Sequence, residues 1–221
     1  MTKHYTLRYF DIIGLAETSR LLLTAAGVEW TNEVPEWPQE KPNQPFGRLP
    51  VLVEKSADGS PDFVLSESQT IERYIARTYG LVPADPKEAA VQEQLRDQIA
   101  DVVLGFFAFA FLKGEEDKKE KRARFDAILQ KLIEVQTKAL QKNGNNGYLF
   151  GDRVSYADAA ALAAYKNLII GSARYDAALA GIVKAQLTPE IAKHLKTVEA
   201  DIAAKADKGK IPTSLTVAID A

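Results

Sequence analysis

The side chains that could carry chemistry in this chain are hydroxyls, carboxylates and basic groups, because its 221 residues include no cysteine. A thiolate nucleophile, a disulfide and a cysteine redox centre within the protein are therefore excluded, and any sulfur chemistry must come from a ligand. The two histidines, His4 and His194, lie at opposite ends of the chain without a second ligand at metal spacing. We expect both to be structural or solvent-facing. Hydrolase and nucleotide-binding motifs are also missing, since there is neither a Gly-x-Ser-x-Gly elbow nor a glycine-rich phosphate loop.

A proline stands directly before a run of strand-forming residues in PFGRLPVLV, residues 45–53. Pro50 has no N–H and a fixed φ, so the first residue of a strand is one of the few sheet positions that suits it. A cis bond before Pro50 would direct the preceding backbone outward, where its donors and acceptors could bind a peptide-like ligand. An ordinary trans proline at the end of a loop is the alternative that the residues alone leave open.

The first 80 residues have the pattern of a small α/β domain that could position such groups. The proline-rich segment 35–46 is expected to be irregular. Alternation and apolar spacing predict strands at 4–10, 29–34, 51–54 and 62–65, and helices at 15–26 and 69–80, the second capped by Ser66 or Ser68.

After Gly80 the pattern becomes helical. Residues 81–84 form the expected joint, and Asp85 followed by Pro86 is typical of an N-cap and the first residue of a long helix. Helical spacing of apolar residues then continues to about residue 206. The fold class is therefore α/β followed by all-α.

Composition excludes several classes of partner. The net charge is −2 and no basic stripe is present, which argues against a nucleic acid. The sequence has no apolar run of about 18 residues and no signal-peptide pattern. We expect a cytoplasmic protein without a membrane partner.

Four blocks resemble, in order and spacing, the signature blocks of the cytosolic glutathione transferases: YTLRYFDIIGLAETSR, WPQEKPNQPFGRLPVL, LSESQTIERYIA and YLFGDRVSYADAAAL. The first two are most similar to the tyrosine-dependent classes, especially sigma. The resemblance implies a thioredoxin-like glutathione-binding domain, βαβαββα, at residues 1–80. It implies an all-helical domain at 81–221 that forms the electrophile site and part of a dimer interface. Glutathione would be a co-substrate, with no bound cofactor or metal.

By this resemblance the catalytic residue is Tyr9, whose hydroxyl would donate a hydrogen bond to the glutathione sulfur. An ordinary thiol, with a pKa of about 8.5, is only about 3% thiolate at pH 7. Lowering that pKa by about 2 units requires roughly 2.7 kcal/mol, which one or two hydrogen bonds to the anion can supply. Tyr5 on the same strand is expected to be a core residue.

The resemblance also implies residues that bind the tripeptide. The backbone of Leu49, before a cis Pro50, would pair with the cysteinyl unit as an added strand. Trp37 and Lys41 would contact the glycine end, where a lysine suits a carboxylate. Arg48 stands where members usually carry Gln or Lys, so it is either a glutathione contact or a solvated side chain.

The γ-glutamyl end would lie at the start of a helix. Ser68 and the free N–H groups behind it suit the γ-glutamyl carboxylate. Glu67, which replaces the usual Gln, would pair with the α-amino group. Ser155 and Asp158 match the family's helix-capping motif and are structural in either interpretation.

The second substrate is expected between the domains, near Phe10, Gly14, Leu15, Phe106 and Phe107. The segment 106–111 has four phenylalanines that cannot all face one side of a helix. Some could line the cleft, or all could be shared between the core and a subunit interface. Leu15 departs from the arginine that many sigma-like and pi-like members carry.

Two alternatives to glutathione conjugation stay open for the function of this chain. A separate expectation concerns its assembly. A sigma-type isomerase would use the same thiolate without consuming glutathione, and a crystallin-like member would bind ligands without turnover. Family members are usually homodimers, and Phe46 matches the aromatic residue that inserts into the neighbouring helical domain.

Overall fold

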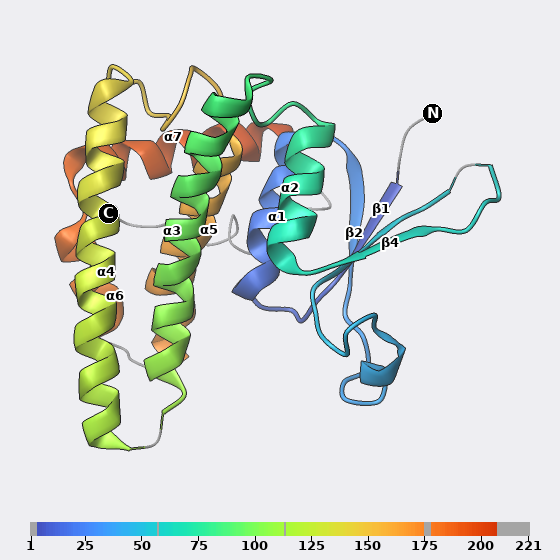
Figure 1. Ribbon diagram of the computed structural model, residues 1–221, viewed down its shortest axis with the longest axis horizontal. Coiled ribbons are helices and arrows are strands. Elements are labelled where there is room, and N and C mark those ends of the chain that lie inside the picture. The colour runs from blue at the N-terminus through green and yellow to red at the C-terminus, as the bar shows by residue number, and fades with distance from the viewer. Residues whose placement is uncertain (1–3, 57, 113, 175–177, 207–221) are drawn as a thin grey trace.

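The computed structural model describes residues 4–56, 58–112, 114–174 and 178–206. Within these residues a four-stranded sheet with its helices forms a thioredoxin-like N-terminal domain, and a C-terminal domain of helices lies beside it (Figure 1). This arrangement confirms the predicted fold class.

The sheet has the strand order β2-β1-β3-β4. Its strands are β1 (His4–Arg8), β2 (Glu29–Glu33), β3 (Val51–Glu54) and β4 (Phe63–Ser66). β1 is parallel to β2 and antiparallel to β3, which is antiparallel to β4. Arg8 lies opposite Val51, and Val51 lies opposite Ser66. The residues just beyond these three positions, Tyr9, Pro50 and Glu67, therefore follow at one end of the sheet.

Two helices, α1 (Glu17–Ala25) and α2 (Ser68–Thr78), lie between the sheet and the helical domain (Figure 1). α1 is buried along its whole length because β2 packs on one side and helices of the second domain pack on the other. It begins later than predicted, since Gly14–Ala16 forms a 3-10 turn. Residues 35–46 were predicted to be irregular, and they contain a 3-10 turn, Lys41–Asn43, in place of the helix that the family order βαβαββα implied between β2 and β3. Prolines throughout this segment remove N–H groups that a longer helix would need.

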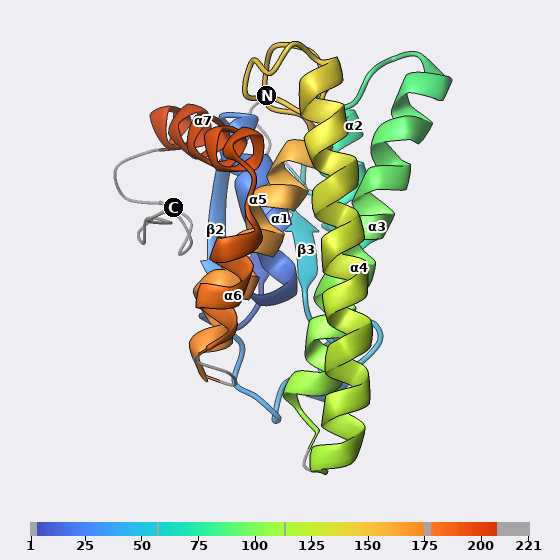
Figure 2. The same cartoon turned by 90° about the vertical axis from the view of Figure 1, so that its left-hand side faces the viewer.

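The helical domain is built around a long pair of neighbouring helices and one buried helix (Figures 1 and 2). Every residue of α5 is buried, which makes it the centre of this domain. The helices are α3 (Pro86–Ala110), α4 (Glu115–Lys142), α5 (Tyr156–Ile169), α6 (Leu179–Gln186) and α7 (Pro189–Lys205), with a 3-10 turn at Gly171–Arg174.

Helix starts in this domain follow local sequence signals. The Asp85 side chain accepts hydrogen bonds from the N–H groups of Lys87 and Glu88, at 2.9 and 3.0 Å. Ser155 and Asp158 form a capping box at the start of α5. Both predicted caps are confirmed. Among the described helices, none is long and apolar enough to cross a membrane.

Candidate active site

Tyr9 immediately follows β1, and its side chain is largely buried. Its N–H donates to the carbonyl of Glu33 on the neighbouring strand, which holds the backbone at the end of the sheet. The hydroxyl oxygen of Tyr9 accepts a hydrogen bond from the N–H of Leu15, at 3.0 Å. Burial raises the pKa of Tyr9, although the Leu15 N–H and the Arg20 guanidinium act in the opposite direction. The phenol therefore keeps its proton at neutral pH and can donate a hydrogen bond.

Arg20 on α1 organises the loop that follows Tyr9. The guanidinium is buried and donates to the carbonyls of Phe10, Ile12 and Ile13, at 3.0, 2.8 and 3.2 Å. It pairs with the buried carboxylate of Glu17, at 2.8 Å. This arginine had no predicted role. The available signal was a pair of opposite charges three residues apart in an otherwise buried helix.

The same guanidinium lies 5.6 Å from the centre of the Tyr9 ring. Arg20 also donates to the side-chain oxygen of Asn32 on β2, at 2.9 and 3.0 Å. A cation near an aromatic face is attracted by the ring electrons, so the contact helps to hold the ring in place.

Gly14 approaches the Tyr9 side chain so closely that only glycine fits. Its φ is +50°, and a Cβ atom there would lie 2.6 Å from the Tyr9 hydroxyl oxygen. The carbonyl of Gly14 accepts a hydrogen bond from Nδ2 of Asn167 on α5, at 3.0 Å. The same Nδ2 donates to the Ala163 carbonyl one turn earlier, at 3.1 Å. Asn167 was not among the predicted site residues, although an amide in an apolar helix is a signal of a buried polar contact.

The Leu49–Pro50 peptide bond is cis, as the resemblance implied. Pro50 is buried directly before β3, and Leu49 is half-buried. A second cis bond, Trp37–Pro38, was not predicted. Arg48 is exposed.

Aromatic rings connect the proline-rich loop with the end of β1. The ring of Phe10 lies 5.4 Å from that of Tyr9 and 5.6 Å from that of Trp37, as measured between centroids. Lys41 is exposed in the adjacent 3-10 turn. Leu15 is half-buried and packs against the core. The structure thus brings Tyr9, Phe10 and Trp37 together.

The start of α2 differs from the predicted cap. Glu67, not Ser66 or Ser68, is the N-cap residue, and its side chain makes no capping hydrogen bond. Glu67 has φ 70°, a left-handed backbone region that is uncommon for residues other than glycine and is found often at functional sites. Ser68 is the first helical residue. Because no side chain caps α2, the N–H groups at its start are suited to an anionic group.

The phenylalanines of α3 divide between the core and the surface. Phe106 and Phe109 are both 1% exposed and pack with Phe125 in the helical core. Phe106 therefore does not line an open cleft, contrary to its predicted place in the electrophile site. Successive helical residues point about 100° apart, and this turns Phe107 out of the core. Phe107 is half-buried and stacks on the exposed Phe111.

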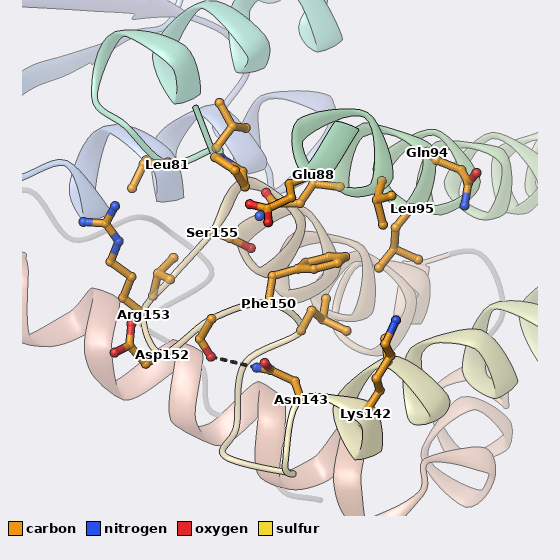
Figure 3. Close-up of a pocket in the computed structure, with 18 of the residues that line it drawn as sticks. Leu81, Glu88, Gln94, Leu95, Lys142, Asn143, Phe150, Asp152, Arg153 and Ser155 are labelled. Atoms are coloured by element: carbon orange, nitrogen blue, oxygen red, sulfur yellow. Dashed lines mark hydrogen bonds between the residues drawn. The ribbon is translucent and has the colours of Figure 1, made fainter. Parts of the chain in front are cut away.

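A cavity of about 750 Å³ lies between α3, α4 and the loops 80–84 and 149–155 (Figure 3). Leu95, Val135 and Phe150 contribute to its apolar wall, and Lys142 and Arg153 contribute charged groups. The residues predicted to bind glutathione are all described by the structure, and none of them lines this cavity. Within the described ranges, no cluster of histidine, aspartate and glutamate side chains could hold a metal ion.

Known proteins share both the sequence pattern and the fold. The chain matches the N-terminal domain of glutathione S-transferase over residues 5–77 and the C-terminal domain over residues 100–204. Glutathione S-transferase 1 from Ascaris suum is 37% identical over 175 residues, which cover 75% of this chain and 82% of the relative. Hematopoietic prostaglandin D synthase from Gallus gallus is 32% identical over 158 residues, covering 70% of this chain and 74% of that protein.

A solved structure supports the same assignment at the level of the fold. The sigma class glutathione transferase of Fasciola hepatica superposes with a TM-score of 0.76 at 23% identity, covering 96% of this chain and 99% of that chain. The sequence matches extend through both the sheet domain and the helical domain. This chain is therefore a glutathione S-transferase and belongs to that family.

Proposed function

We propose that this chain binds glutathione at the end of the sheet, activates it as a thiolate at the Tyr9 hydroxyl, and conjugates it to small apolar electrophiles. The observation that carries the proposal is the strand register. Arg8, Val51 and Ser66 lie side by side, which sets Tyr9, the cis Pro50 and the open start of α2 along one edge.

The chemistry follows from the protonation state of Tyr9. Because burial raises the pKa of Tyr9, its phenol is a hydrogen-bond donor rather than a base. The glutathione thiol loses its proton to solvent, and the Tyr9 hydroxyl stabilises the resulting anion. The sulfur then forms a bond to the electrophilic carbon, and the leaving group departs with the bonding electron pair. A hydrogen bond to a charged acceptor contributes about 1.5–3 kcal/mol, which is the size of effect that thiol activation requires.

The remaining predicted contacts would orient the tripeptide. The Leu49 backbone would pair with the cysteinyl unit, and Trp37 and Lys41 would contact the glycine end. Ser68 would contact the γ-glutamyl carboxylate and Glu67 its α-amino group. Lys41 and Glu67 are both exposed, so a ligand can reach their charged groups. Phe10 and Phe107 supply apolar surface for the electrophile.

A second candidate is a glutathione-dependent isomerase, because one relative of similar length is named a prostaglandin D synthase. Such an enzyme would regenerate glutathione at the end of each cycle. Total thiol stays constant during isomerisation and falls during conjugation, so a thiol assay during turnover separates the two activities.

We also propose that the protein is a homodimer in which Phe46 of one copy enters the cavity of the other (Figure 3). Phe46 is 67% exposed beside Gly47, a large apolar area for a side chain in a loop. The cavity has an apolar wall on α3 and α4 that could receive an aromatic ring. The ring and the cavity lie at different places on the chain, so a two-fold arrangement can place the Phe46 ring of each copy in the cavity of the other.

The experiment that tests the proposed function is Tyr9→Phe, with Tyr5→Phe as a matched control on β1, the strand that Tyr9 follows. Tyr5 is buried, and its hydroxyl hydrogen-bonds to that of the half-buried Tyr79, at 2.7 Å. Tyr9→Phe is expected to raise the apparent pKa of bound glutathione by roughly one to two units with little loss of affinity. Ultraviolet titration of the bound thiolate measures this. An unchanged thiol pKa in Tyr9→Phe, or an equal rise in Tyr5→Phe, would remove Tyr9 from the catalytic role.

A further inference from the structure

We propose that Asn167 is a positioning residue for Tyr9, acting through the single peptide unit that joins Gly14 to Leu15. The inference rests on the proposed role of Tyr9 in thiolate formation. Through this residue α5, the buried helix of the second domain, helps to set the reactivity of Tyr9 in the first domain. The Asn167 side chain is 6% exposed and lies 153 residues along the chain from its acceptor.

The two hydrogen bonds of this peptide unit leave from its opposite edges, in opposite directions. Its carbonyl, from Gly14, accepts from Asn167 Nδ2 at 3.0 Å, and its N–H, from Leu15, donates to the Tyr9 hydroxyl oxygen at 3.0 Å. The C=O and N–H of a trans peptide point in opposite directions in a rigid unit. Fixing the carbonyl therefore fixes the direction of the N–H.

This direction decides where the phenol proton points. A phenol can donate one hydrogen bond and accept others. Because the Tyr9 oxygen accepts from Leu15, its own proton is directed away from this peptide and is free for the glutathione sulfur. If the peptide rotated by half a turn, the Gly14 carbonyl would face the phenol and accept that proton instead.

The rotation changes ψ of Gly14 and φ of Leu15, and glycine tolerates a wide range of backbone torsions at little cost because it has no Cβ. The hydrogen bond from Asn167 opposes the rotation, because the rotated carbonyl would leave the buried amide without this acceptor. Nδ2 is itself oriented by its second bond, to Ala163 within the same helix.

Neighbouring groups do not provide a substitute. Arg20 holds the carbonyls of Phe10, Ile12 and Ile13, but its recorded hydrogen bonds do not include the Gly14 carbonyl. The positive charge of Arg20 acts on the Tyr9 hydroxyl, and the carboxylate of Glu17 pairs with that charge. Asn167 thus completes the support of this loop from the other domain.

The test uses Asn167→Leu, which keeps the side-chain size and removes both donors, in the wild-type and Tyr9→Phe backgrounds. Tyr165→Phe is the matched control, because it removes one buried hydrogen bond from the same helix, to Gln136 at 2.7 Å on α4. Ultraviolet titration of bound glutathione gives the thiol pKa. Turnover of chlorodinitrobenzene across pH gives an independent profile.

Asn167→Leu is expected to raise the pKa of the bound thiol by roughly half to one unit, which lowers the rate below that pKa about 3- to 10-fold. Activity should recover at higher pH, with little change in the KM for glutathione. In the Tyr9→Phe background, Asn167→Leu should not raise the thiol pKa any further. Tyr165→Phe should leave the thiol pKa unchanged. If Asn167→Leu does not fold, Asn167→Ala replaces it in the same comparison.

The outcomes separate this inference from the proposed function. If Tyr9→Phe leaves the thiol pKa unchanged, the proposed role of Tyr9 fails. If Tyr9→Phe raises that pKa and Asn167→Leu does not, the positioning role alone is overturned. It is also overturned if the Asn167 effect persists undiminished without the Tyr9 hydroxyl, or if Tyr165→Phe produces the same shift.

Discussion

The carboxylate of Glu72 on α2 receives two hydrogen bonds from the guanidinium of Arg96 on α3, from Nε at 2.6 Å and from Nη2 at 2.8 Å. The hydroxyl of Tyr156, the first residue of α5, donates a third at 3.0 Å. All three side chains are buried. They join α2, the helix that begins at the predicted γ-glutamyl site, to α3 and α5 of the second domain.

Arg96→Met should strongly destabilise the protein, because it leaves the Glu72 carboxylate buried with Tyr156 as its remaining recorded partner. Removing one member of a buried ion pair typically costs about 3–5 kcal/mol of unfolding free energy. Denaturation in urea measures the loss. The double variant Glu72→Leu/Arg96→Met should recover most of it, since no buried charge is left unpaired.

An exposed pair on the same two helices is the control for this prediction. Arg77 on α2 and Glu93 on α3 are 2.6 Å apart, with the arginine side chain 62% exposed. Arg77→Met should cost less than about 1 kcal/mol. The assignment of Arg96 as a connection between domains is wrong if Arg96→Met costs no more than Arg77→Met.

Gly14→Ala should impair catalysis more than folding. The new Cβ would lie 2.6 Å from the Tyr9 hydroxyl oxygen, so the ring or the loop must move. Displacing a catalytic group by about 1 Å can reduce turnover by roughly 100-fold. The kcat and KM with chlorodinitrobenzene measure the effect. Gly27→Ala is the control because its φ is also positive, at +65°, but no atom lies within 4 Å of the added Cβ. Equal losses of activity in the two variants would contradict the prediction.

His194 predicts a pH dependence of stability. The ring is fully buried, with Nδ1 3.0 Å from the Gly147 carbonyl oxygen and 3.6 Å from the carboxylate of Asp158. Burial lowers the pKa of His194, although Asp158 acts in the opposite direction. The unfolded chain then binds the proton more tightly, so this contribution is present above about pH 6.5 and is lost as pH falls through the folded value.

His194→Phe removes this titration. At about pH 7.5 the variant should be less stable by about 1 kcal/mol, because the hydrogen bond to Gly147 is lost. The difference should shrink as the pH is lowered towards about 5.5, where only the wild-type protein must keep a histidine unprotonated. Burial raises the pKa of Asp158, which gives the opposite slope as that carboxyl titrates. Both proteins retain this group, but His194→Phe also removes the His194 charge that lowers the Asp158 pKa. Urea denaturation at several pH values provides the comparison, and parallel curves would rule out the His194 contribution.

The features predicted well from sequence depend on neighbours in the chain. Asp85 and Ser155 cap helices through N–H groups two or three residues away, so their role is visible in a short window. The cis geometry at Pro50 is different, because the residues alone left cis and trans open and only the family resemblance favoured cis.

The features that were missed depend on distant partners. Arg20 and Asn167 donate to backbone carbonyls, which have no sequence signature, and the Asn167 contact spans 153 residues. Phe106 was assigned to the cleft because the four phenylalanines of 106–111 cannot all face one side of a helix. Helical spacing does not show which of these faces meets the core. Phe125 on α4 covers Phe106 in the fold.

Phe46→Ala should weaken the proposed dimer. Truncating a buried aromatic anchor typically costs roughly 2 kcal/mol or more of association, or about 30-fold in the dissociation constant. Phe111→Ala is the matched control, because Phe111 is a similarly exposed phenylalanine, at 60% against 67%, but lies at the end of α3 away from the cavity lining. Val135→Trp should weaken the dimer as well, since it fills the cavity from α4, and combining it with Phe46→Ala should add little. Sedimentation equilibrium over a dilution series measures all four proteins against wild type. A wild-type monomer would reject the dimer, and an equally tight dimer for Phe46→Ala would reject the anchor, because the exposed ring would then have no part in association.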